Sequence, residues 1–170
     1  MHDETSIVNG GDNRKTTDIY LALRAQIFAY ATRPSARSEY IALMMDWPLA
    51  KGTTTIMAGA DGSASLYLSN GGAFIGGGQK YLTLRNCALA AIECARDVES
   101  LMSPATEYPI PPISEISFYL VKRGHMLTVT AKESDLRQNH GPLAKLGNAA
   151  MAIMTQYRLI TSQPKNRTVQ

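Results

Sequence analysis

Apolar residues recur along this chain with two different periods, and the changes of period divide it into helices and strands. Spacings of three and four residues predict helices over 17–30, 80–102 and 142–160. Alternation and short apolar runs predict strands over 40–47, 53–60, 64–69, 116–120 and 127–130. The order helix, three strands, helix, two strands, helix predicts an α+β fold, with a single antiparallel sheet of about five strands and helices packed on it.

Turn residues and prolines mark the boundaries of this pattern. Asp61-Gly62 between two strand patterns predicts a two-residue hairpin turn with a positive φ at Gly62. Prolines 104, 109, 111 and 112 predict a long extended connection before the fourth strand. The polar ends, residues 1–15 and 163–170, are expected to be disordered tails of a single domain over 17–162.

A glycine-rich segment, residues 71–78, precedes the second helix. Backbone amides at a helix start can hold an anion, and Lys80 adds a positive charge. The spacing fits neither a P-loop, because Gln79 separates the glycines from Lys80, nor a dinucleotide fingerprint, because the preceding strand belongs to a hairpin. The alternative is a structural turn whose glycines allow tight packing. The candidate anion or ligand residues are Gly71, Gly72, Gly76, Gly77, Gly78, Lys80 and, in a later loop, His140.

Residue types suited to nucleophilic catalysis are present without motif spacing. They are Ser65, Ser69, His125, Asp135 and His140, and no G-x-S-x-G turn accompanies them. We therefore predict no catalytic residue, and we expect Ser65 and Ser69 on the solvent face of their strand. His140 precedes the last helix, where it either serves a site or packs its loop.

Metal and redox chemistry have little support in the sequence. The three histidines share no ligand spacing, and Cys87 and Cys94 lie on the apolar seam that runs from Leu84 to Leu101. We therefore predict no metal, no cofactor and two core thiols, which is typical of a reducing compartment.

Composition narrows the classes of partner. The chain has 170 residues, 45% of them hydrophobic, a formal charge of +3 and only 7% aromatic residues, with its basic residues scattered. This argues against a nucleic-acid partner. No run is long enough to span a membrane and the start does not read as a signal peptide, so we expect a cytoplasmic protein.

The last helix pattern is apolar nearly all round. Away from its core seam it carries Ala149, Met151, Ala152 and Met154, and between 142 and 160 only Lys145 and Arg158 are charged. A helix of this kind is buried on more than one side, either by the first helix or by another subunit. We predict a homodimer or higher oligomer, with Met151, Ala152 and Met154 as interface residues.

The segment DGSASLYLSNGGAFIGGG, with Ile116-Ser-Phe-Tyr-Leu120 and His140-Gly-Pro-Leu143, resembles a set of small bacterial proteins of unknown activity. The resemblance covers about residues 19–160 and implies a fold without implying a function. The element order is also similar to the profilin-like sheets of roadblock and longin domains, which are dimerising regulators. The leading hypothesis is a non-enzymatic, self-associating module that binds a protein partner. The alternative is a protein that binds a small molecule or an anion through residues 71–78, either as a binding protein or as an enzyme.

Overall fold

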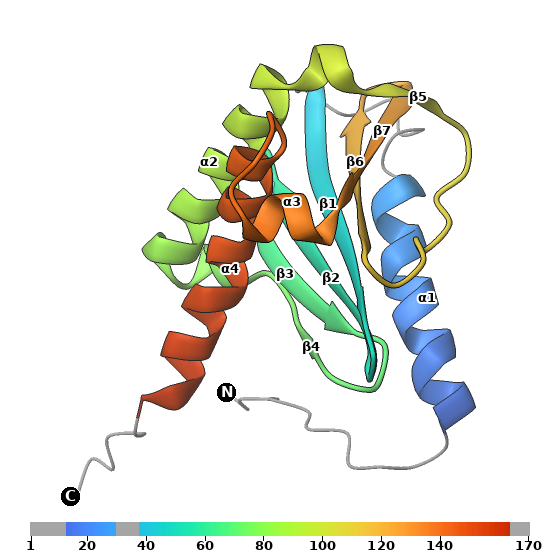
Figure 1. Cartoon of the computed structure of the whole chain (residues 1–170). Helices are drawn as coiled ribbons and strands as arrows, with labels where there is room; N and C mark the ends of the chain where they lie inside the picture. Colours follow the sequence, from blue (N-terminus) through green and yellow to red (C-terminus); the bar gives the residue numbers. More distant parts are fainter. Residues whose placement is uncertain (1–12, 30–37, 164–170) are drawn as a thin grey trace, which may run out of the picture.

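The computed structural model describes residues 13–29 and 38–163, with side chains described from Thr17 onward (Figure 1). The helices are α1 (Asn13–Ala29), α2 (Leu82–Asp97), α3 (Glu133–Arg137) and α4 (Ala144–Ser162), with short 3-10 turns η2 (Gly77–Gln79) and η3 (Glu99–Leu101). The strands are β1 (Tyr40–Leu49), β2 (Gly52–Gly59), β3 (Ala64–Leu68), β4 (Ala73–Phe74), β5 (Ser103–Ala105), β6 (Glu115–Lys122) and β7 (His125–Lys132). Most of the predicted tails lies outside the described residues, but residues 13–15, predicted to belong to a tail, begin α1.

One antiparallel sheet organises the fold, which confirms the predicted α+β class. Its strand order is β4-β3-β2-β1-β6-β7-β5, so β1 lies at the centre and pairs with β2 and β6. The sheet has seven strands rather than about five. The two additional strands, β4 and β5, are two and three residues long and occupy the two edges. Such short edge strands leave few unpaired groups for unwanted pairing with other chains.

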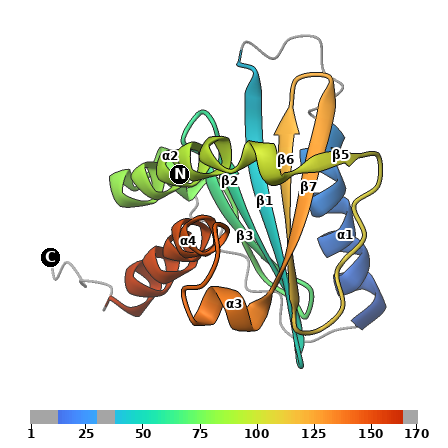
Figure 2. The same ribbon diagram turned by 45° about the horizontal axis from the view of Figure 1, so that its top comes forward.

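Alternate residues of the strands serve two different cores. Residues such as Leu43, Phe118 and Leu120 point to the face that α2 and α4 cover, while Met44 and Tyr119 point to the face that α1 covers. Figure 2 shows α2 and α4 together on one side of the sheet and α1 alone on the other. The period of two along each strand is therefore what divides the interior.

Two helical predictions need correction. The second helix ends at Asp97 rather than near residue 102, and η3 follows it, so Leu101 is exposed rather than part of the core seam. The short helix α3, which follows β7, was not among the three predicted helices. Cys94 on α2 is buried as predicted, whereas Cys87 is only half-buried.

The β2–β3 connection is a hairpin with a longer turn than predicted, because residues 60–63 lie outside the two strands. Gly62 has φ 84°, as its position required. The Asp61 carboxylate accepts a hydrogen bond from the Ser63 amide at 2.8 Å, and this closes the turn. Among the described residues, no helix combines the length and apolar character needed to cross a membrane.

Candidate functional site

Several amides in and just after the glycine-rich segment donate to acceptors within the protein. The Gly76 amide donates to Ser65 Oγ at 3.1 Å and the Gly77 amide to the Tyr157 hydroxyl at 3.1 Å. In η2 and directly after it, the amides of Gln79, Lys80 and Tyr81 donate to the carbonyls of Gly76 and Gly77. An anion-binding loop needs amides that point outward to a ligand. These five amides are already used inside the fold.

The same glycines permit close packing. A side chain at Gly78 would meet the carbonyl oxygen of Gly62 at 1.9 Å, and one at Gly77 would meet the Tyr157 hydroxyl at 2.4 Å. The Tyr157 hydroxyl in turn donates to the Ala64 carbonyl at 2.7 Å. Burial raises the pKa of Tyr157 to about 12, so its hydroxyl stays protonated and can donate. The segment therefore fastens the end of α4 to β3 and to the β2–β3 turn.

Of the other candidate ligand residues, Lys80 directly follows this segment, whereas His140 lies apart from it. His140 is exposed and precedes the start of α4, whereas Gly77 contacts Tyr157 near its end. These two points are about 20 Å apart along the helix axis. The Lys80 ammonium is exposed and lies 5.4 Å from the centre of the Tyr81 ring. His140 and the glycines are thus not brought into one site.

The residue types considered for nucleophilic catalysis are also separated. Ser65 lies in β3 and His125 in β7, with three strands between them, a separation of about 19 Å. Contrary to expectation, Ser65 does not face solvent: it is fully buried, and its hydroxyl accepts the Gly76 amide. The Ser69 hydroxyl accepts the Thr53 amide at 2.7 Å. Both serines therefore have structural partners.

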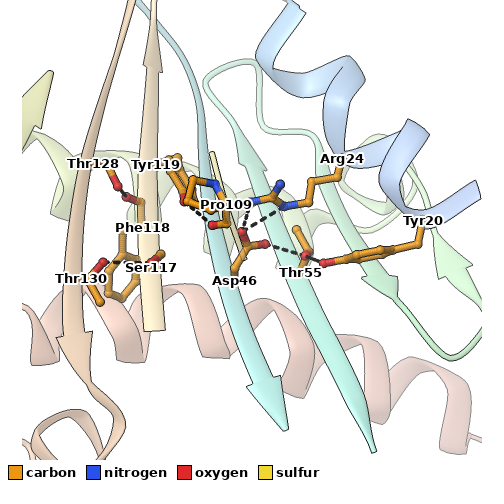
Figure 3. A network of polar contacts seen from close by, with 10 residues as sticks. All are labelled: Tyr20, Arg24, Asp46, Thr55, Pro109, Ser117, Phe118, Tyr119, Thr128 and Thr130. Atoms are coloured by element: carbon orange, nitrogen blue, oxygen red, sulfur yellow. Dashed lines mark hydrogen bonds and ion pairs between the residues drawn. The ribbon is translucent and has the colours of Figure 1, made fainter. Parts of the chain in front are cut away.

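A buried polar network lies between α1 and the centre of the sheet (Figure 3). Arg24 of α1 donates through Nε, at 3.0 Å, and through Nη2 to the carboxylate of Asp46 on β1. The other carboxylate oxygen accepts from Thr55 Oγ1 at 2.6 Å, and that hydroxyl contacts the Tyr20 hydroxyl at 2.7 Å. Asp46 is fully buried and Arg24 is 3% exposed, so the charges are shielded from water.

Aromatic rings enclose the Arg24 guanidinium. Its central carbon lies 5.3 Å from the ring centres of Phe28 and Tyr108 and 5.7 Å from that of Tyr119. Phe28 stacks on Tyr108, which belongs to the proline-rich connection between β5 and β6. The Tyr119 hydroxyl donates to the carbonyl of Pro109 in the same connection at 2.6 Å. The cluster joins α1, the proline-rich connection and the sheet.

The electrostatics of this network favour its charged form. Burial opposes the charge of Arg24, but the hydrogen bond and the attraction of Asp46 outweigh it and raise the pKa of Arg24. Burial, together with the nearby Asp46 charge, raises the pKa of Tyr20 to about 12. The network was not predicted from the sequence. The signal that points to it is a carboxylate inside the apolar run 40–47, since a buried charge requires a partner.

A second ionic cluster lies at the rim of the other face. Lys122 of β6 is buried, and its ammonium contacts Glu99 at 2.5 Å and Glu39 at 3.0 Å. The Tyr40 hydroxyl donates to the second oxygen of Glu99 at 2.6 Å. The hydrogen bonds from Lys122 and Tyr40 lower the pKa of Glu99. This cluster ties the turn after α2 to the central strands.

A shallow surface depression lies beside α3. It is lined by Ile113, Ser114, Glu115, Lys132, Glu133, Ser134 and Arg137. The Nε and Nη2 groups of Arg137 both donate to Glu133, and the guanidinium lies 5.5 Å from the centre of the Trp47 ring. Among the described side chains, the Trp47 indole N–H is the buried polar group without a hydrogen-bond partner. Arg137 and Glu133, two of the charged residues that line the depression, thus pair with each other.

The outer side of α4 carries the remaining candidate surface. Asn148, Thr155 and Leu159 are exposed, and Ala152 is half-buried among them. These positions share one side of the helix because they are four, three and four residues apart. Of the predicted interface residues, Met151 and Ala152 are half-buried, whereas Met154 packs in the core at 7% exposure.

Within residues 13–29 and 38–163, no group of three His, Cys, Asp or Glu side chains is arranged to hold a metal ion. The chain matches no protein-family model, no curated protein and no solved structure.

Proposed function

We propose that this protein is a cytoplasmic protein-interaction module that self-associates through the outer side of α4 and presents the assembled surface to a protein partner. The observation that carries the proposal is the chemistry of α4. Its 19 residues include no carboxylate, and only Lys145 and Arg158 are charged. A helix that faces water alone normally carries a charged stripe, whereas this one exposes 53% of Leu159.

The outer side of α4 is also suited to pairing with itself. Ala152 lies at its middle, and a small side chain there lets two helices approach closely. In an antiparallel pair that crosses at Ala152, Asn148 of one copy would lie near Gln156 of the other, because each is four residues from the crossing point. Amide side chains can exchange hydrogen bonds in that position. A two-fold axis uses the same surface twice, as most homodimers do.

The alternative, an anion or small-molecule site at residues 71–78, has less support. The amides of Gly76, Gly77, Gln79, Lys80 and Tyr81 donate to protein acceptors. His140 lies before the start of α4, about 20 Å along the helix axis from Tyr157.

Sedimentation velocity at tens of micromolar protein tests the proposal. We expect the wild-type chain to sediment as a dimer and Leu159→Lys to sediment as a monomer, because the new charge would be buried at the contact. Leu49→Lys is the matched control, since Leu49 is 38% exposed at the end of β1 and lies on the sheet rather than on α4. It should remain dimeric.

Thermal unfolding of the two variants separates a lost contact from a lost fold. Exposed substitutions of this kind change the free energy of unfolding by about 0.5 kcal/mol or less. A wild-type chain that sediments as a monomer contradicts the proposal. So does a Leu159→Lys variant that stays dimeric.

A further inference from the structure

The connection between β5 and β6 exposes its side chains with a period of three. Residues 106–114 lie in neither a helix nor a strand. Ala105, Tyr108 and Pro111 are half-buried, and the two residues that follow each of them are exposed. A strand repeats every two residues and an α-helix about every 3.6, whereas a polyproline II helix repeats every three. The exposure pattern of this connection is therefore that of a polyproline II helix.

The local sequence imposes the same backbone shape. Each residue from Tyr108 to Pro112 is a proline or directly precedes one. The proline ring holds φ at about −65°, and a residue before proline is kept in the extended region. This whole stretch is therefore restricted to polyproline II geometry, which makes no internal backbone hydrogen bonds.

The inward edge of the segment is anchored to the α1 side of the sheet. Tyr108 stacks on Phe28, with ring centres 3.8 Å apart. The Tyr119 hydroxyl donates to the Pro109 carbonyl at 2.6 Å. Figure 1 shows the connection, in yellow, running beside α1 before it turns into β6. Because the segment is already held in its extended shape, a partner can bind it without first ordering it.

Two outward edges of the segment remain for a partner. One edge carries Pro109 and Pro112, which are one turn apart, and the other carries Glu107, Ile110 and Ile113. Ile113 is 63% exposed, and Glu107 forms no ion pair with the residues that the structure describes. Rigid prolines three residues apart are the feature that aromatic-lined grooves recognise in polyproline II ligands. The unpaired carboxylate beside them is complementary to a cation.

We propose that residues 107–113 are a ligand for a protein partner whose groove of aromatic side chains receives Pro109 and Pro112, with a basic side chain of that partner opposite Glu107. This inference rests on the proposed function only in that the protein has a protein partner, and it names the chemistry of that partner. It does not require the dimer, because the segment packs on the α1 side of the sheet and α4 lies on the other side. In the proposed dimer, each copy presents one such segment.

Titration of the full-length protein with purified SH3, WW and EVH1 domains tests the proposal, because each of these domains has an aromatic-lined groove for polyproline II ligands. The protein carries a fluorescent label, and anisotropy is followed as each domain is added up to about 1 mM. We expect saturable binding of at least one domain, and displacement by a free oligoproline peptide that occupies the same groove. If no domain binds, or if oligoproline does not displace the one that does, the proposal is overturned.

Substitution of the two outward prolines identifies the surface that binds. Pro109→Ala combined with Pro112→Ala should weaken binding about tenfold or more, because both anchors of the groove are lost. Pro142→Ala is the matched control, since Pro142 is exposed ahead of α4 and outside the segment, and it should bind like the wild type. Glu107→Lys should also weaken binding, most strongly at low salt, where the repulsion of like charges is least screened. Equal binding of the double proline variant and the wild type contradicts the proposal.

Melting temperatures show whether these variants keep the fold. If the double proline variant does not fold, Ile110→Ser combined with Ile113→Ser leaves every proline in place and removes the exposed apolar edge. It should weaken binding as well, and unchanged binding would overturn the proposal. Sedimentation of the same samples reports self-association separately. A monomer that binds the domain contradicts the α4 contact alone, and a dimer that binds no domain contradicts the proline segment alone.

Discussion

The two faces of the sheet are built by different physical means. Under α2 and α4 the interior is almost wholly apolar, and residues such as Leu84, Leu146 and Ile153 are fully buried. Alanines on α2 let that helix approach the strands closely. Under α1 the centre is an ion pair between Arg24 and Asp46, with tyrosines around it. On the face that α2 and α4 cover, the ion pair of Lys122 with Glu99 lies at the rim.

This difference separates stability from specificity. Apolar burial is non-directional and stabilises in proportion to the area removed from water. A buried ion pair contributes little net stability but excludes partners that lack the matching charge. We infer that α2 and α4 unfold together with the sheet, whereas α1 is held more weakly but more selectively.

The largest effect is expected from a matched pair of truncations, one on each face. Ile153 on α4 is fully buried and Ile27 on α1 is 3% exposed. Ile153→Ala should lower the free energy of unfolding by about 2–5 kcal/mol, because the cavity lies in the shared core. Ile27→Ala should cost less, since α1 can leave the sheet without unfolding the rest. Urea denaturation measures both values, and equal losses would contradict the proposed division.

The next effect concerns the centre of the α1 face. Removing one member of a buried ion pair lowers the free energy of unfolding by about 3–5 kcal/mol when the remaining charge stays buried. Asp46→Asn should cost less, about 1.5–3 kcal/mol, because undocking returns Arg24 to water and only the charged hydrogen bonds are lost. Hydrogen exchange should show α1 amides losing protection while β6 amides keep theirs. Arg24→Met combined with Asp46→Leu should restore most of the stability.

One result would show that α1 is part of the cooperative core. In it, Asp46→Asn lowers the free energy of unfolding by the full amount of about 3–5 kcal/mol, and the α1 amides exchange only upon global unfolding. Arg24→Met alone is the complementary control. It leaves Asp46 under the helix and should undock α1 to a similar degree.

Local periodicity was sufficient to predict the order of the main elements. The alternation around Leu66 and Leu68 and the helical spacing from Leu146 to Tyr157 both survive in the structure, because each pattern fits one buried face. The edge strands β4 and β5 could not be predicted in this way. Two or three residues contain no measurable period, and they pair because a neighbouring strand is available.

The candidate sites were harder to predict because they depend on distant partners. The glycines at 71–78 signalled a tight turn, but the acceptor for the Gly77 amide is Tyr157, 80 residues later. The carboxylate of Asp46 lies within an apolar run and therefore needs a partner. That partner, Arg24, is 22 residues earlier in the chain, and no local pattern identifies it. Spacing predicts the shape of a segment, while the assembled fold determines which polar groups remain free for a ligand.

The smallest effect is expected at the rim of the face that α2 and α4 cover. The hydrogen bonds from Lys122 and Tyr40 lower the pKa of Glu99 below the ordinary value of 4.5. A carboxylate with a lowered pKa in the folded state stabilises fully above its unfolded pKa, and this contribution is lost as the pH falls through the folded-state value. The wild-type protein should therefore lose stability as the pH falls below about 4.5, and Glu99→Gln should flatten that part of the profile.

The expected change for Glu99→Gln at neutral pH is about 1 kcal/mol or less, because the Glu99 side chain is 27% exposed and partly screened. Urea midpoints at a series of pH values measure it. Glu93→Gln removes the same charge from the exposed side of α2 and should keep the wild-type profile. Two results would show that the ionic groups at the rim and at the centre do not differ as proposed. In the first, Glu99→Gln keeps the pH dependence of the wild-type urea midpoint. In the second, it lowers the free energy of unfolding as much as Asp46→Asn does. In that case the contrast between the two faces would rest on apolar packing alone.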